Sequence, residues 1–591
     1  METVTITIDG KPATVEKGKT VLEAAIQNGT GVPYYCYHPG LGVDGSCRVC
    51  IVRIEKMAKL QTACSTICTD GMVVITDAPD VVSARASVLE FLLINHPLDC
   101  PVCDKGGECP LQDFAYSYGP ERSRMEFPRR VFDGEGVRAD VDFGPTLMLN
   151  RNRCILCTRC VRFMREIDGD AQIGIVQRGY GSEIATFEER GVISLLSGNL
   201  MDVCPVGAIL TRQYRFRSRP WDNPQAVDTI CTLCAKGCNS TAWIKATPEW
   251  AKGAQLIRMT PRLNPEVNSF WMCDIGRFDY AWVEGERRLL QPHLGQGPTG
   301  HAVPWADALI AVKDAIDAAG SFDRVQFLVS AHASLEELFV LREVAQKCGD
   351  VTVSWPYREK PQPASTKFRI PAVDAPNVRG AGDLGFDVGD GTGPATLSKL
   401  KDAVTAGKVG VLYVIDPGPE GSLGDADWIV EARRSGKIAT LIVQGVLHTP
   451  LTDAADIVLP GSAWVEKDAT YTNMTGHVQA SSRVIPPPGD AGEDWQILMK
   501  LAAIFGEPVA FASAAAVREA IARAVPSIPG YAALPSTGFA RPVAARHWLQ
   551  ASNPSERWKW DFMFQDLPPV KFGEDFGPLP RADVIPLKEV P

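Results

Sequence analysis

The stretch His96-Pro97-Leu98-Asp99-Cys100-Pro101-Val102-Cys103-Asp104-Lys105-Gly106-Gly107-Glu108-Cys109 places one imidazole and three thiols within fourteen residues. These side chains are soft or borderline metal ligands, and the prolines and glycines between them let the chain turn around a metal group. A lone histidine is usually structural, but this one precedes a C-x2-C-x5-C run. The pattern therefore predicts a [4Fe–4S] cluster, whose potential the imidazole should raise. Its ligands would be His96, Cys100, Cys103 and Cys109.

Cysteine usage divides the chain into two halves. Of the 17 cysteines in 591 residues, all but Cys348 precede residue 280. The N-terminus has no basic region followed by an apolar one, so we expect no secretory signal and a reducing compartment. In that setting, closely spaced cysteines are metal ligands more often than disulfides. We therefore expect the N-terminal half to carry the metal chemistry.

Length and charge limit the other possibilities. The chain is too long for one hydrophobic core, so we expect roughly three to five domains. A net charge of -10 gives no support for nucleic-acid binding. No apolar run approaches the roughly 18 residues that span a membrane. A membrane association is therefore expected only through partners.

The first 80 residues have the pattern of a β-grasp ferredoxin domain. Residues 3–9 alternate and end in a turn, which predicts a hairpin arm. A capping box at Thr20 begins a helix that ends at Gly29, and residues 50–54 and 72–75 form further short strands.

The loop of this domain carries the cysteine pattern C-x10-C-x2-C-x13-C. Plant-type ferredoxins bind a [2Fe–2S] cluster with a shorter first loop of the same kind. Glycines in the loop would let backbone amides approach the sulfides, although zinc stays open as an alternative. Cys68 is left over and is expected to be a small buried residue. The predicted ligands are Cys36, Cys47, Cys50 and Cys64.

Downstream, a C-x2-C-x2-C run resembles bacterial ferredoxins, with a Cys-Pro pair 44 residues later as the fourth ligand. A β insertion at 173–196 is expected between them. Residues 151–219 hold eleven arginines and no lysine. This is either a solvated basic face, or charge compensation for a cluster with docking of an acidic partner. The predicted [4Fe–4S] ligands are Cys154, Cys157, Cys160 and Cys204.

A fourth set has the spacing C-x2-C-x3-C with one cysteine 35 residues further on. Short strands around 242–244 and 255–258 are expected between them. We predict a further [4Fe–4S] cluster, with zinc as the alternative. Its ligands would be Cys231, Cys234, Cys238 and Cys273.

Beyond residue 280, helix-period segments alternate with apolar strand runs, which predicts a parallel sheet covered by helices on both faces. The expected helices are 305–319, 336–348 and 425–435, and the expected strands are 325–329, 351–355, 409–415, 439–443 and 457–459.

Two further segments lie in this half. Residues 380–385 match G-x-G-x-x-G, but no strand precedes them and no helix opens after them, so we reject a dinucleotide site. Residues 508–591 contain one expected helix near 514–524. The rest, including the aromatic segment 558–564, is expected to be an extended tail that wraps a neighbour or folds back.

In this order, over about residues 1–507, the motifs resemble the large iron–sulfur subunit of NADH–quinone oxidoreductase, respiratory complex I (the bacterial G-type, or 75-kDa-type, subunit). Segments 455–460 and 466–479 resemble the late part of molybdopterin oxidoreductases. The fold class is thus multidomain α+β and α/β. The expected domains are 1–80 (β-grasp [2Fe–2S]), 81–120 ([4Fe–4S] held by one histidine and three cysteines), 121–220 ([4Fe–4S] ferredoxin-like), 221–279 ([4Fe–4S] of molybdopterin-oxidoreductase type), 280–507 (molybdopterin-oxidoreductase-like α/β without cofactor) and 508–591 (C-terminal extension).

The resemblance implies an electron-transfer subunit without a substrate site of its own. Electrons would pass from the flavin of an NADH-binding partner subunit toward quinone, coupled in the complex to proton translocation. The cofactors would be one [2Fe–2S] and three [4Fe–4S] clusters, and the fourth set would bind a cluster that only some members possess, off the main route. The partners would be peripheral-arm subunits, with the membrane arm contacted only indirectly. The location would be the cytoplasmic side of the bacterial inner membrane.

Three alternatives remain. An NAD-linked formate dehydrogenase shares the N-terminal cluster array, but active molybdopterin enzymes resemble one another in a lysine soon after the last cluster cysteine. Here Cys273 is followed by Asp-Ile-Gly-Arg, and the α/β region is short, so we expect no molybdenum. A zinc-stapled scaffold is the second alternative. A hydrogenase diaphorase chain is the third, but it should end near residue 240.

Overall fold

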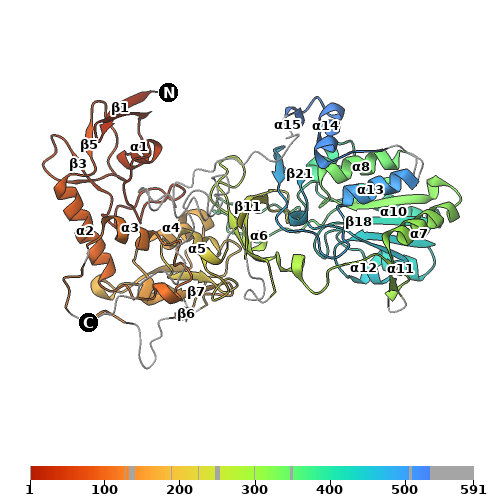
Figure 1. Ribbon diagram of the computed structural model, residues 1–591, viewed down its shortest axis with the longest axis horizontal. Helices are drawn as coiled ribbons and strands as arrows, with labels where there is room; N and C mark the ends of the chain where they lie inside the picture. The colour runs from red at the N-terminus through yellow and green to blue at the C-terminus, as the bar shows by residue number, and fades with distance from the viewer. Residues whose placement is uncertain are drawn as a thin grey trace, which may run out of the picture.

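The computed structural model describes residues 2–532 except 121, 127, 132–139, 188–189, 224, 246–252, 298–299, 347–349 and 505–508. Cys348 and the segment 558–564 therefore lie outside the described residues. Two modules lie side by side, with the N-terminal domains at one end and the α/β domain at the other (Figure 1). Among the described residues, no helix combines the length and apolar character needed to cross a membrane.

The N-terminal domain is a five-stranded sheet in the order β2-β1-β5-β3-β4. β1 pairs with β2 antiparallel and with β5 parallel. The side chain of Thr20 caps α1, because its Oγ accepts from the Glu23 amide at 3.2 Å and Glu23 accepts from the Thr20 amide at 2.8 Å. The predicted hairpin and capping box are thus confirmed. The elements are β1 Thr3–Ile8, β2 Lys11–Glu16, α1 Val21–Gln27, β3 Ile51–Ile54, β4 Gln61–Thr62 and β5 Val73–Ile75.

The next region has two small sheets that share one hydrophobic core with its helices. Its three-stranded sheet has the order β10-β7-β6, and β8 and β9 form the β hairpin that was predicted between the cysteines. The elements are α2 Pro79–Leu93, α3 Pro110–Tyr118, β6 Asp140–Asp142, β7 Leu147–Asn150, α4 Arg159–Phe163, β8 Ile173–Val176, β9 Glu183–Thr186, α5 Asn199–Val203 and β10 Ile209–Thr211. A three-residue 3-10 turn precedes Cys103, and a π-helical turn, Met164–Asp168, continues α4.

A three-stranded antiparallel sheet, β11-β12-β13, then leads to the short helix α6. These elements lie between the two modules in Figure 1. Their bounds are β11 Gln225–Ile230, β12 Asn239–Ile244, β13 Leu256–Pro261 and α6 Asp274–Phe278.

The α/β domain contains a seven-stranded sheet in the order β15-β14-β20-β19-β18-β16-β17, in which the last five are parallel. The predicted parallel sheet is thus confirmed. The strands are β14 His293–Leu294, β15 His301–Ala302, β16 Val325–Ser330, β17 Val351–Ser354, β18 Val411–Asp416, β19 Thr440–Gly445 and β20 Ile457–Pro460, with β21 Ala469–Thr472 and β22 Val478–Ser481 as a separate pair.

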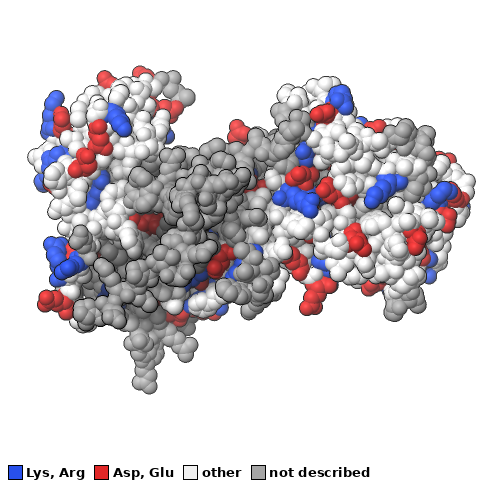
Figure 2. Space-filling view, in the orientation of Figure 1, with Lys and Arg blue, Asp and Glu red and all other residues white. Residues whose placement is uncertain are grey.

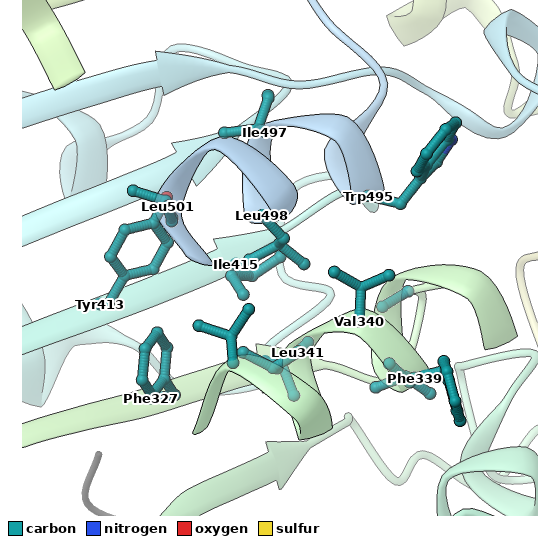
Figure 3. Packing of buried hydrophobic residues seen from close by; sticks show 14 of the residues in the cluster. Phe327, Phe339, Val340, Leu341, Tyr413, Ile415, Trp495, Ile497, Leu498 and Leu501 are labelled. Atoms are coloured by element: carbon teal, nitrogen blue, oxygen red, sulfur yellow. The ribbon is translucent and has the colours of Figure 1, made fainter. Parts of the chain in front are cut away.

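Side chains alternate between the two faces of this sheet. Phe327, Tyr413 and Ile415 pack under α8 and α13 (Figure 3), whereas Leu328, Leu412 and Val414 join the core of the opposite face. Both faces are therefore covered by helices. α7 Trp305–Ala318, α8 Leu335–Ala345, α13 Asp494–Ile504 and α14 Ala514–Ala524 cover one face, and α10 Leu397–Thr405, α11 Asp427–Arg434 and α12 Pro450–Asp453 cover the other.

Two segments of this domain bear on the sequence predictions. The G-x-G-x-x-G run lies largely within the short helix α9 (Val378–Asp383), so it does not form a strand-to-helix phosphate loop. The predicted helix over Ala514–Ala524 is present as α14. Its Val517 and Ile521 are fully buried in the core with α8, and Arg518 forms a buried ion pair with Glu336 at 2.6 Å. This helix is therefore part of the α/β core.

A buried charge triad supports the same core. Lys467 Nζ lies 2.5 Å from Glu337 and 3.1 Å from Asp494, and all three side chains are at most 1% exposed. The Asp494 carboxylate also accepts from the Ser462 amide and from Gln444. Lys467 thus pairs with two carboxylates that water does not reach, and burial raises the pKa of one of them, Glu337, to about 7.

Replacing Lys467 by Met should destabilise this domain strongly. Two uncompensated carboxylates would remain buried, which typically costs about 3–5 kcal/mol of unfolding free energy. Calorimetry on the full chain measures the loss as a lower melting temperature of the α/β transition. The control is Lys313→Met, because Lys313 pairs with Asp317 in a surface i,i+4 pair. Equal melting temperatures for the two variants would contradict this account of the triad.

Candidate metal centres

The four predicted ligand sets are numbered in chain order. Site 1 is Cys36, Cys47, Cys50 and Cys64; site 2 is His96, Cys100, Cys103 and Cys109; site 3 is Cys154, Cys157, Cys160 and Cys204; site 4 is Cys231, Cys234, Cys238 and Cys273.

Site 1 lies in the β-grasp domain, where the structure brings its thiols into direct contact. The Cys36 thiol contacts those of Cys47 and Cys64, and the Cys50 thiol also contacts Cys64. Hydrogen bonds from the Cys47 and Cys64 side chains hold the pKa of Cys36 well below its usual range. Cys68 is buried outside the set.

The site 1 loop is held by the helix that belongs to site 3. Arg162 of α4 donates to the carbonyls of Leu41 and Gly42, both at 3.2 Å, and to that of Cys36. Gly42 has φ +71°, a left-handed conformation that suits glycine. An arginine 120 residues further on therefore fixes the shape of the predicted [2Fe–2S] loop.

Site 2 combines buried and exposed residues. Cys103 and Cys109 are buried, whereas Cys100 is exposed. Cys109 precedes α3 directly, and the amides of Gln112 and Leu111 donate to its sulfur. Burial outweighs these bonds and raises the pKa of Cys109 to about 12.

His96 meets the requirements of a neutral imidazole ligand. Its Nδ1 atom is buried and has no hydrogen-bond partner among the described residues. Burial, and then the charge of Arg153, lower its pKa to about 4. The ring is therefore uncharged at neutral pH, as metal ligation requires.

The segment from Cys204 to Gly207 contacts both site 3 and site 2. Cys109 Sγ donates to the Pro205 carbonyl at 3.8 Å. A Cβ on Gly207 would overlap Cys103 Sγ, so no side chain fits at that position. The segment that supplies the last cysteine of site 3 thus packs directly against two thiols of site 2.

Site 3 surrounds a small, mostly apolar cavity that all four cysteines line, together with Leu149, Ile155, Thr158, Ile184, Val206, Ala208 and Ile209. Leu156 and Thr158 have φ values of +53° and +64°. Such backbone is costly for residues with side chains and is typical of functional sites. It turns amides toward sulfur, and the Leu156 amide donates to Cys154 Sγ at 3.4 Å.

Site 4 lies between the two modules. All four cysteines are buried and interact electrostatically with one another. Cys273 precedes α6, and a Cβ on Gly276 would lie 2.7 Å from Cys231 Sγ. The α/β domain holds the first loop of the site, because Gln479 donates to Gly237 at 2.9 Å and the Met474 amide donates to Ala235 at 2.8 Å.

The chemistry of these sets fits iron–sulfur clusters. Burial raises the pKa of Cys154 and Cys273 to about 12 and that of Cys157 to about 11. Such thiols become thiolates only when a bound cation supplies positive charge.

At the switch point of the α/β sheet, two loops of the described residues pack against each other. Ligands of such sheets bind at the carboxyl ends of the strands where the strand order reverses, which here is between β16 and β18. There Ser330 donates to the Ser422 carbonyl at 3.0 Å. A Cβ on Gly418 would lie 2.7 Å from the His332 ring. The two loops pack on each other, so we assign no step to a molybdopterin.

Some contacts around the sites could not be read from the sequence. Trp271, two residues before Cys273, stacks on His38, two residues after Cys36, with ring centroids 5.5 Å apart. Trp271 also meets Phe163 of α4 at 5.0 Å. Gly207 and this aromatic group give no periodic signal. For Arg162, the only indication in the sequence was its place among the eleven arginines of residues 151–219.

Comparisons with known families agree with this layout. Residues 1–79 match a 2Fe-2S iron-sulfur cluster binding domain, and residues 85–124 match the NADH-ubiquinone oxidoreductase-G iron-sulfur binding region. Residues 144–210 match the ferredoxin-like domain of NADH-quinone oxidoreductase subunit 3, and residues 377–504 match molybdopterin oxidoreductase.

Whole-chain relatives come from the same complex. The G-type subunit of NADH-quinone oxidoreductase from Rickettsia bellii is 30% identical over 84% of this chain and 86% of its own length. The mitochondrial NADH-ubiquinone oxidoreductase 78 kDa subunit of Candida albicans is 29% identical over 84% of this chain and 82% of its own length. A chain of an NAD+-reducing [NiFe]-hydrogenase structure has 30% identity and a TM-score of 0.33, and the match covers 37% of this chain and 93% of that one.

The fold and the family matches define a multi-cluster iron–sulfur protein with [2Fe–2S] and [4Fe–4S] domains and a molybdopterin-oxidoreductase-like α/β domain. The chain belongs to the family of the large, G-type subunit of NADH–quinone oxidoreductase, the iron–sulfur electron-transfer subunit of respiratory complex I. The predicted family is thus confirmed over the formate dehydrogenase alternative.

Replacing Gly207 by Ala tests the contact between sites 2 and 3. The added methyl group would displace Cys103, so site 2 should lose its cluster and the chain about four iron atoms. Iron analysis of anaerobically purified protein measures the loss. The matched control is Gly181→Ala, because a Cβ there meets nothing closer than 3.6 Å. An unchanged iron content in the Gly207 variant would contradict the account that this segment holds Cys103 in place.

Proposed function

We propose that sites 1 to 4 bind one [2Fe–2S] and three [4Fe–4S] clusters, and that the chain passes electrons from the flavin of a partner subunit toward quinone. The observation that carries this proposal is the proximity of the sets to one another. Bound clusters would act as one-electron carriers. The chain itself positions the ligands, keeps most of the thiols away from water and donates amide hydrogens to the sulfurs.

The contacts support the order site 1, site 3, site 2 along the route. Helix α4 of site 3 holds the site 1 loop through Arg159 and Arg162. The segment Cys204 to Gly207 joins site 3 to site 2. Site 3 is therefore the middle member, in contact with both others.

Site 4 contacts this row at site 3 and, through Trp271 against His38, at the loop of site 1. Arg277 of α6 forms a buried ion pair with Asp202 of α5, just before Cys204. The Asp274 carboxylate accepts from the Gly198 amide at 2.7 Å. The row of three does not pass through site 4, which supports a role off the main route.

Membership of the family supports a proposal for the partner and the location. We propose that an NADH- and flavin-binding subunit delivers the electrons, and that the chain lies on the cytoplasmic side of the membrane within the peripheral arm. On the face shown in Figure 2, acidic and basic side chains are interspersed over the described parts of both modules. Docking on this face would then rest on local charge complementarity.

Replacing Cys204 by Ala in the assembled complex tests the route. Loss of the middle cluster should abolish NADH–quinone reduction, while NADH–ferricyanide reduction at the partner's flavin continues. The matched control is Cys68→Ala, because Cys68 is a buried cysteine outside every set. Both activities should persist in the control. Quinone reduction that survives in a purified Cys204→Ala complex would place site 3 off the route.

A further inference from the structure

Arg159 spans the gap between site 1 and site 3. Its side chain is buried, and Nη2 donates to the Tyr37 carbonyl at 2.5 Å while Nη1 donates to the Val203 carbonyl at 3.3 Å. Tyr37 follows Cys36 in the sequence, and Val203 precedes Cys204. One guanidinium therefore holds the peptide groups next to a predicted ligand of each site.

Arg153 stands in the corresponding place between site 3 and site 2. It is buried, precedes Cys154, and its Nε donates to Asp99 at 2.9 Å. Asp99 in turn precedes Cys100. Site 3 thus has buried arginines toward both of its neighbours: Arg153 toward site 2, and Arg159 and Arg162 toward site 1, where Arg162 lies 3.9 Å from Asp44.

Arg153 and Arg159 differ in how their charge is balanced. Asp99 pairs with Arg153. Arg159 contacts carbonyl oxygens, and no carboxylate among the described residues forms an ion pair with it. A buried cation without a counter-charge is costly. Clusters held by four thiolates carry net negative charge, so sites 1 and 3, once loaded, supply what Arg159 lacks.

We propose that Arg159 and Arg153 are positioning residues that fix site 3 against its neighbours, and that their charges set the reduction potentials of the clusters on either side. Arg159 acts on sites 1 and 3, and Arg153 acts on sites 3 and 2. This inference rests on the proposed function. The step served is the transfer of one electron from a reduced to an oxidised cluster, in which no bond forms or breaks.

The test is an EPR-monitored redox titration of the anaerobically purified full chain, with dithionite as reductant. Arg159→Met removes the charge and should lower the reduction potentials of sites 1 and 3. We expect the equilibrium constant for reduction to fall about tenfold, which is about 59 mV for one electron. Site 2 should be unchanged. Arg153→Met should likewise lower the potentials of sites 2 and 3, because it removes one positive charge and leaves the Asp99 carboxylate without its partner.

Two further variants separate charge from structure. Arg159→Lys keeps the charge and should restore most of both potentials. Arg165→Met is the matched control from the same stretch, because Arg165 is exposed and pairs with its neighbour Glu166, so no potential should change. If Arg159→Met does not retain its clusters, Arg159→Gln removes the charge and keeps a donor for one carbonyl.

The inference is overturned if Arg159→Met gives the same potentials as the Arg165 control, or if the potentials of sites 1, 2 and 3 fall equally. It is also overturned if Arg159→Lys shifts the potentials of sites 1 and 3 as much as Arg159→Met does. The proposed function fails separately. A wild-type chain without clusters would refute it, whereas clusters with unchanged potentials in the variants would refute only the role of the arginines. Because dithionite is the reductant, neither result depends on electrons delivered from NADH.

Discussion

The segment from Cys204 to Gly207 has to serve two sites at once. Its cysteine lines the site 3 cavity, its Pro205 carbonyl accepts from Cys109, and its glycine leaves the space that Cys103 occupies. The Asn150 amide binds the next carbonyl, that of Ala208, at 2.7 Å, so the segment is fixed to β7. The spacing between sites 2 and 3 is thereby set by backbone rather than by flexible side chains, and the surrounding core has to hold that backbone still.

The α/β domain contributes to the same rigidity. Its residues 365–370 reach into the cluster module, where the Lys367 amide donates to the Ile167 carbonyl at 2.8 Å and Phe368 and Ile370 join the core that includes sites 3 and 4. Its segment 473–479 holds the first loop of site 4. At the ligand-binding edge of its sheet, the loops after β16 and β18 pack against each other. The domain therefore acts as a scaffold that supports the sites.

Much of this arrangement could be predicted from the sequence, because most ligands of a site are close together in the chain. Three of the four residues in each of sites 2 to 4 lie within ten positions of one another, and strand and helix periods fixed the β-grasp and α/β folds. The contacts between sites did not follow. Arg159 binds a carbonyl 122 residues away, and no local pattern encodes such a pair. The helix near 514–524 was predicted, but its packing was not: α14 buries Val517 and Ile521 against α8, and the partner of that apolar face cannot be identified before the sheet is known.

The account depends on iron–sulfur clusters at all four sites. The most direct measurement is iron, acid-labile sulfide, zinc and molybdenum per chain on anaerobically purified protein. The account predicts about fourteen iron atoms, a comparable amount of sulfide and no molybdenum. Zinc in place of iron would contradict the electron-transfer function. Stoichiometric molybdenum would contradict the scaffold role of the α/β domain.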